Sequence, residues 1–411
     1  MKKYEPFIME EDRLMLRTVR DFVEKEIMPV RKQLDDPQRG HHIYTELMEG
    51  LVHIGLQKRA LPREIGGLGQ SSAVSQTTTS EELARGDPLF GIMPGMAAWI
   101  FGPAIVSRNM TVLEKFAAQF CEDKLHTAAL SLTEPSGGCN IASAEERGRT
   151  IQTIARSEGD EWVINGHKRW TSNGGIAEIY LVLCQTDHAL GEDGIALIYV
   201  PAGTPGMSFG KPENLMGFKA DINLEVFYDD VRVPKAWRAS DEPGRDGRNV
   251  RRISCFARLI SAASLTGVAQ GVFDYVVEYT ANRFFGGKQV RQHTMQAGIL
   301  ADMAIDLLSA RAFYLQIASW FDNRAVFGSP TGDFLLGMAS AIRIYAADAT
   351  IRSCNKAMEL MGAYGYSEDY PIAKYLRDSK ILQLWEGGVH QTRIDVARAF
   401  YSVHGPELVI P

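Results

Sequence analysis

The spacing of apolar residues divides the chain into two helical parts with a β part between them. From Glu10 to about Val106, apolar positions recur at helical spacing. From about Thr127 the period changes to two, which is typical of strands. From about Ile253 helical spacing returns in long segments with few breakers. The predicted strands cover residues 150–155, 162–164, 179–183, 195–200 and 224–228, and the predicted long helices cover 256–282, 292–322, 334–361 and 372–384.

This pattern predicts a multi-domain α+β protein. We expect an N-terminal all-α domain over residues 1–126, a middle antiparallel β-barrel-like domain over 127–238, and a C-terminal four-helix bundle over 239–411. Within the β-domain, the pair Asn165-Gly166 predicts a tight hairpin turn.

Composition and charge remove several classes of function. The 411 residues are 45% hydrophobic and 23% charged, with a formal net charge of −6, so a soluble globular protein is expected and a nucleic-acid partner is disfavoured. Five scattered cysteines without a CxxC pair favour reduced thiols in a cytoplasmic protein and argue against a metal site. The first residues lack the apolar run of a signal peptide, and no run of about 20 apolar residues predicts a membrane span.

The stretch from Tyr375 to Arg398 carries the first candidate for chemistry. Two helical patterns flank Trp385 and Glu386, and the pair Gly387-Gly388 favours a break between them. A carboxylate at such a break, if it faces a cavity, has a raised pKa and suits a general base. Taken alone, a glutamate before two glycines is more often a solvated charge at a helix end.

Three other segments combine polar groups with glycines, and a fourth lacks charge. Residues 130–140 (LSLTEPSGGCN) offer hydroxyls and backbone N–H groups to a planar ligand, or form only a polar turn. Residues 168–175 (KRWTSNGG) offer a Trp and hydroxyls to the same kind of ligand, or contain only a buried core Trp. Residues 283–288 (RFFGGK) offer two cations to phosphate, or are solvated loop charges. Residues 90–99 contain no charged side chain and line either a helix contact or an apolar substrate pocket.

Together and in this order, these segments resemble the acyl-CoA dehydrogenase family of flavoenzymes. The most specific matches are residues 132–138 (LTEPSGG), 164–173 (INGHKRWTSN), 362–366 (GAYGY) and 385–387 (WEG), and the resemblance covers residues 10 to about 400. It implies FAD bound between the domains, a homotetramer, and oxidation of an acyl-CoA thioester to the 2-enoyl-CoA. Electrons would pass to electron-transferring flavoprotein or a similar acceptor.

The resemblance also implies roles for individual residues. Glu386 matches the base that takes the α-proton while the β-hydrogen leaves as hydride to flavin N5, and its backbone N–H polarises the thioester carbonyl. Trp170 matches a ring-stacking Trp, Ser172 the hydroxyl near N5, and Arg283 an arginine that reaches the FAD of a neighbouring subunit. The implied cofactor contacts are Leu130, Ser131, Thr133, Trp170, Ser172, Arg283, Gly362, Gly388 and His390, and the implied substrate contacts are Cys139, Arg258 and Gly387.

Departures from the family pattern leave details open. Cys139 replaces a common Ser and Cys255 a common carboxylate in the CoA region, while Gly286 and Gly388 replace residues beside the FAD adenine and phosphates. Trp385 replaces the usual Tyr, which narrows the pocket toward short, branched or cyclic acyl groups.

The absence of Arg and Lys from residues 90–99 disfavours a dicarboxylic substrate. The alternatives are an acyl-CoA oxidase or monooxygenase on the same fold, an enoyl-CoA reductase direction, and a binding module without catalysis. The retained Glu386 speaks against a monooxygenase.

Overall fold

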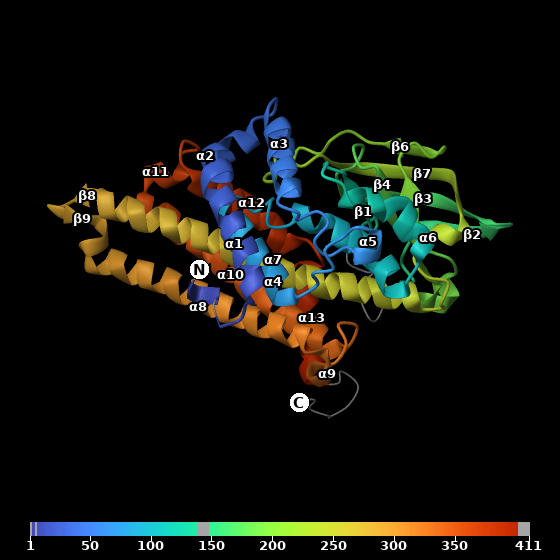
Figure 1. Ribbon diagram of the computed structural model, residues 1–411. Coiled ribbons are helices and arrows are strands. Elements are labelled where there is room, and N and C mark those ends of the chain that lie inside the picture. Colours follow the sequence, from blue (N-terminus) through green and yellow to red (C-terminus); the bar gives the residue numbers. More distant parts are fainter. Residues whose placement is uncertain (1, 5, 138–147, 402–411) are drawn as a thin grey trace.

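The computed structural model describes residues 2–4, 6–137 and 148–401, and it has the three expected parts (Figure 1). A group of N-terminal helices packs between a curled sheet at one end and a long C-terminal helical bundle. The expected fold class is confirmed.

The N-terminal part contains four helices of twelve residues or more. They are α1 (Glu10–Phe22), α3 (Gly40–His53), α4 (Ala73–Gly86) and α5 (Met96–Ser107), joined by the shorter α2 (Met28–Val30), α6 (Met110–Val112) and several turns of 3₁₀ or π helix. Every residue of α4 except Gln76 is buried, because this helix packs against α1 on one side and the C-terminal bundle on the other. Ser72 caps α4 by accepting the backbone N–H of Ser75.

The middle part is one seven-stranded sheet of mixed direction. Its strands are β1 (Ala128–Ser131), β2 (Ile154–Glu158), β3 (Glu161–Ser172), β4 (Ile179–Gln185), β5 (Ile195–Pro201), β6 (Met207–Phe209) and β7 (Asn223–Pro234). Their order is β1-β4-β2-β3-β7-β6, with β5 also paired to β4. Most pairs are antiparallel as expected, but β1 and β2 run parallel to β4.

The hairpin turn expected at Asn165-Gly166 was the wrong prediction. Both residues lie inside β3, and the turn that joins β2 to β3 is at Gly159-Asp160. A Cβ at position 166 would come within 2.4 Å of the Thr153 side chain, so this glycine serves a close approach across the sheet.

The C-terminal part is built on α7 (Arg245–Asn282), α8 (Thr294–Asp322), α10 (Asp333–Met361) and α12 (Pro371–Leu384), followed by α13 (Gly388–Phe400). The short α9 (Arg324–Phe327) and α11 (Ala363–Tyr366) connect them, and the hairpin of β8 (Phe284–Phe285) and β9 (Lys288–Gln289) links α7 to α8. Helix α7 runs the length of the molecule from the sheet to this hairpin (Figure 1). By length and composition alone α7 and α10 could cross a membrane, but most of each apolar window is buried inside the protein.

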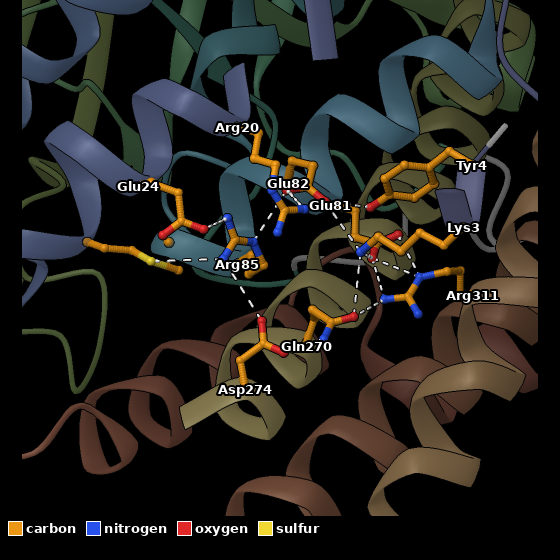
Figure 2. A network of polar contacts seen from close by, with 12 residues as sticks. Lys3, Tyr4, Arg20, Glu24, Glu81, Glu82, Arg85, Gln270, Asp274 and Arg311 are labelled. Atoms are coloured by element: carbon orange, nitrogen blue, oxygen red, sulfur yellow. Dashed lines mark hydrogen bonds and ion pairs between the residues drawn. The ribbon is translucent and has the colours of Figure 1, made fainter. Parts of the chain in front are cut away.

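A buried ionic network joins the N-terminal segment to α4, α7 and α8 (Figure 2). The Glu81 carboxylate accepts from Lys3 Nζ at 3.0 Å and from Arg311 Nη2 at 2.6 Å, and the neighbouring Glu82 pairs with Arg20 and Arg85. Burial works to raise the pKa of Glu81, but the two cations outweigh it and lower this pKa to about 2. The ionised form of Glu81 is therefore favoured in the folded state.

The variant Glu81→Gln is expected to lower the free energy of unfolding by roughly 3 kcal/mol at neutral pH. Because the folded pKa lies below the ordinary 4.5, this contribution is complete above about pH 4.5 and is lost as the pH falls toward 2. Urea denaturation at pH 7 and at pH 3 measures it. Glu10→Gln, which removes an exposed partner of Arg13, is the control and is expected to cost at most about 1 kcal/mol. Equal losses in the two variants would contradict the prediction.

Candidate active site

Glu386 lies at the break between α12 and α13. Helix α12 ends at Leu384 and α13 begins at Gly388, so the tripeptide 385–387 forms the connection. Glu386 itself has a left-handed backbone with φ of 51°, and Gly387 follows with φ of 91°. A left-handed glutamate is uncommon and costs energy, which marks this turn as a functional candidate.

Arg343 of α10 donates hydrogen bonds to backbone carbonyls at this break. Its buried guanidinium donates to the carbonyl oxygens of Leu382 at 3.2 Å, Gly388 at 3.3 Å and Trp385. The Leu382 carbonyl lies in the last turn of α12, where carbonyls lack a helical partner. The Trp385 oxygen also accepts from the Gly388 N–H at 2.9 Å, and the Gly388 oxygen also accepts from the Thr392 hydroxyl at 2.8 Å. Arg343 therefore joins the end of α12 to the start of α13 and supplies a donor to the Leu382 carbonyl.

The carboxyl group of Glu386 is desolvated and has a raised pKa. Burial is the cause, and it is opposed by the positive charges of Arg258 and Arg343 and by a hydrogen bond with the Ser254 side chain. Both arginines and Ser254 are buried, so the carboxylate sits beside fixed charges and a hydroxyl. This is the environment that the sequence hypothesis requires of a general base.

Arg258, an expected substrate contact, lies close to Glu386. Its side chain is fully buried in α7, and Nη1 donates to Ser340 Oγ and to Asp395 Oδ2, both at 2.7 Å. Its Nε and Nη2 have no hydrogen-bond partner among the described residues. The charge of Arg258 opposes the raised pKa of Glu386.

The indole of Trp385, at the break, lies next to that of Trp99, which lines a cavity. The rings of Trp385 and Trp99 are 6.0 Å apart, and Trp385 Nε1 donates to Ser261 Oγ at 3.0 Å. This cavity of about 60 Å³ has apolar walls that include Phe90, Ile92, Ala98, Phe256 and Ile260. The segment of residues 90–99 thus forms both a helix contact and a pocket wall.

The segment from Leu130 to Thr133 lies at the open edge of the sheet, because β1 is the terminal strand in the sheet order. The Ser131 hydroxyl is buried and accepts from Tyr228 at 3.0 Å, so this residue offers a ligand its backbone only. The turn after β1 is fixed by Lys168, which donates to Leu132 O at 2.9 Å and to Glu134 at 2.8 Å.

The end of β3 contains the second expected group of cofactor contacts. The pairing of β3 with β7 is interrupted between Lys168 and Thr171, and Trp170 there has φ of 59° and is 49% exposed. Because of this irregularity the Trp170 side chain lies outside the core. The alternative that Trp170 is a buried core residue is therefore wrong. The pairing resumes at Thr171, and Ser172 lies opposite Asn223.

Of the remaining expected site residues, two lie at the far end of the bundle, two directly follow the break at Glu386, and one is outside the described part. Arg283 and Gly362 are exposed at the far end of α7 and α10, where the Arg283 guanidinium lies 5.3 Å from the Tyr364 ring, and Figure 1 shows that end away from the sheet. Gly388 and His390 begin α13, and His390 is exposed. Cys139 lies outside the described residues.

Three residues that sequence reasoning did not select belong to this site. They are Arg343 and Ser254 beside Glu386, and Asp221, whose Oδ2 accepts from the Ser172 hydroxyl at 2.6 Å. Arg343 could have been noticed as a cation within the apolar run 338–347, since a buried arginine requires partners. Nothing in the sequence around Asp221 signals its contact.

Comparisons with known proteins cover almost the whole chain. Residues 9–109, 129–231 and 254–401 match the N-terminal, middle and C-terminal domains described for acyl-CoA dehydrogenases. The human mitochondrial short-chain specific acyl-CoA dehydrogenase is 30% identical over 391 residues, which are 94% of this chain and 89% of that protein. The glutaryl-CoA dehydrogenase of Desulfococcus multivorans is 28% identical, with 95% and 96% covered. The structure of butyryl-CoA dehydrogenase from Megasphaera elsdenii is 28% identical, with a TM-score of 0.84 and 95% and 98% covered.

Proposed function

The chain belongs to the acyl-CoA dehydrogenase family of FAD-dependent oxidoreductases, and we propose that it oxidises a short, neutral acyl-CoA to the 2-enoyl-CoA with Glu386 as the base. The observation that carries this proposal is the position of Glu386. It occupies a strained turn between two helices and has a raised pKa. The neighbouring Trp385 ring lies 6.0 Å from the Trp99 ring, and Trp99 lines a cavity.

The residues of the described part fit a flavin. The open edge of β1 offers backbone groups to a planar heterocycle, and the irregularity in β3 presents the Trp170 face and the Ser172 hydroxyl next to it. Leu130, Thr133, Trp170 and Ser172 would hold the ring. A bound flavin supplies the acceptor for the hydride that leaves the β-carbon of the thioester.

Glu386 performs the proton transfer in this proposal. Its ionised carboxylate takes the proton from the α-carbon, and general-base work of this kind contributes about 10²–10⁴-fold to a rate. The backbone N–H of Glu386 donates to the thioester oxygen, where negative charge develops. Burial of the Glu386 carboxyl keeps it from bulk water.

The size and lining of the cavity favour a short, neutral acyl chain. A space of about 60 Å³ accommodates only a few carbon atoms. Arg59 is the one cation among its lining residues, and its guanidinium already donates to Thr79 at 2.7 Å, Gln70 at 3.2 Å and the Asp12 carboxylate at 3.4 Å. A distal carboxylate on the substrate would have to displace Asp12.

Anaerobic titration of the FAD-loaded protein with a panel of acyl-CoA thioesters tests the function and the acyl group together. We expect butyryl-CoA and short branched thioesters to bleach the flavin absorbance, and glutaryl-CoA to do so at least about tenfold more slowly, because a buried unpaired carboxylate costs several kcal/mol. Glutaryl-CoA turnover that exceeds that of neutral thioesters by an order of magnitude would refute the substrate class. A protein that stays colourless after incubation with FAD would favour a binding module instead.

Electron acceptor and assembly complete the proposal. We assign the electrons to electron-transferring flavoprotein or a similar acceptor, and hydrogen peroxide formed on mixing with substrate in air would instead favour an oxidase.

A homotetramer is supported by large apolar side chains that stand exposed on the bundle, at Phe284, Phe285, Met295, Ile305 and Leu308. It is also supported by the distance of Arg283 and Gly362 from the sheet end, which suits a cofactor of another subunit.

A further inference from the structure

A buried carboxylate is hydrogen-bonded to Ser172 at the edge of the proposed flavin site. Asp221 precedes β7, and its Oδ2 accepts from Ser172 Oγ at 2.6 Å and from Asn223 Nδ2 at 3.4 Å. Its Oδ1 is shielded from solvent and accepts no hydrogen bond of good geometry among the described residues, although the Asn173 N–H lies near enough to lower the pKa of this carboxyl. An unsatisfied carboxylate oxygen is costly in a folded protein and calls for an explanation.

The direction of these hydrogen bonds limits what Ser172 can offer to a ligand. A serine hydroxyl has one proton, and here that proton points to Asp221. Asn223 Nδ2 donates to the same Ser172 oxygen at 3.2 Å, which leaves one lone pair for a further donor. Toward the cofactor, Ser172 is therefore an acceptor, poised to receive a proton.

Burial and the groups around Asp221 act in opposite directions on its pKa, with a net increase. Burial raises the pKa of Asp221, and the hydrogen bonds from Ser172 and Asn223 and the charge of His41 oppose this shift. The other titratable group that faces it is Tyr44, whose own pKa is raised by burial and by the charge of Asp221. A carboxyl group with a raised pKa accepts a proton more readily than an ordinary aspartate and can pass it on.

Neighbours of this carboxylate line a cavity that is large enough for water. A cavity of about 260 Å³ lies between α3 and the start of β1, and its lining includes His41, Tyr44, Ala128 and Asn173. His41 Nδ1 lies 3.0 Å from the carbonyl oxygen of Ala220, and Asn173 follows Ser172 in the chain. The cavity has both polar partners and room for water.

We propose that Ser172 and Asp221 form a proton relay that carries away the proton released at the cofactor edge when the reduced enzyme passes its electrons to the acceptor. In each transfer Ser172 Oγ gains one proton and gives its own to Asp221, so one O–H bond forms and one breaks on the serine. Asp221 then releases the proton to water in the cavity, and the two electrons leave to the acceptor. The relay rests on the proposed function, and Asp221 acts on the cofactor only through Ser172.

Reoxidation of the reduced holoenzyme by ferricenium, a one-electron acceptor, tests the relay. The enzyme is first bleached anaerobically with butyryl-CoA, or with dithionite if no thioester bleaches it, and absorbance is then followed in H₂O and in D₂O. Asp221→Ala is expected to slow reoxidation at least about tenfold and to increase the solvent isotope effect, because water must replace the base. Added formate, a small carboxylate that fits the cavity, is expected to restore much of the rate, which would not happen if Asp221 were only structural.

Two further variants and the flavin content make the outcome decisive. Asp229→Asn removes an exposed carboxylate on β7 and is expected to behave as the unaltered protein. Ser172→Thr keeps the hydroxyl and should retain the relay, whereas Ser172→Ala should lose it without formate rescue. Asp221→Ala that retains FAD and reoxidises at the original rate and isotope effect would overturn the relay. Failure of every thioester to bleach the unaltered protein would instead overturn the proposed function, while the dithionite arm still tests the relay.

Discussion

Replacing Glu386 by glutamine is expected to abolish flavin bleaching by acyl-CoA almost completely while leaving thioester binding in place. The amide keeps the size and the backbone of the residue, but it cannot accept the α-proton, so the rate should fall by about 10²–10⁴-fold or more. Stopped-flow absorbance under anaerobic conditions gives the rate, and the spectral change on mixing with a thioester gives the binding. Bleaching at a rate close to that of the unaltered protein would remove Glu386 from its proposed role.

The pH dependence of bleaching adds an independent check on the same residue. Only the ionised carboxylate is a base, and burial raises the pKa of Glu386 above its ordinary value. The rate should therefore fall as the pH drops through this raised pKa, and the Gln variant should show no such acid limb. Glu368→Gln, on an exposed side chain paired with Arg377, is the matched control and should keep both rate and profile.

The division into helical and β parts was readable from the sequence because it depends on local periodicity. The apolar spacing of 334–361 and 372–384 predicted α10 and α12 to within one residue at each end. Strand pairing was less readable, since it joins segments far apart in the chain. The parallel pairing of β1 with β4 and the place of Gly166 against Thr153 depend on contacts across the sheet, and Asn-Gly looks the same in a turn and in a strand.

The site was readable only where a motif is contiguous. Gly387 and Gly388 indicated the break at Glu386, because left-handed backbone is a local property of glycine. The groups that tune this carboxylate come from α7 and α10, more than 40 residues earlier, and only the folded chain brings them together. Asp221 illustrates the same limit, since its contact with Ser172 spans 49 residues.

Loss of Arg343 is expected to produce the second-largest effect, on stability and on chemistry together. Arg343→Met removes the donor that the carbonyls of Leu382, Trp385 and Gly388 share. The Trp385 and Gly388 oxygens keep the Gly388 N–H and the Thr392 hydroxyl as donors, whereas the Leu382 oxygen loses its donor. A buried unsatisfied group costs about 1–3 kcal/mol, so we expect the free energy of unfolding to fall by about 2 kcal/mol. Urea denaturation measures this loss, and Arg352→Met is the control on the same helix, because it removes only an exposed pair with Asp306 worth at most about 1 kcal/mol.

The chemical part of this effect has a defined sign. Arg343 is one of the two cations that oppose the raised pKa of Glu386, so removing it should raise that pKa further. The acid limb of bleaching should then move to higher pH in Arg343→Met. Arg343→Lys keeps the positive charge but loses the planar guanidinium that donates to several carbonyls at once. It should therefore keep the pH profile of bleaching closer to that of the unaltered protein than the free energy of unfolding. A profile that is the same in Met and Lys variants would show that Arg343 holds the turn without tuning the base.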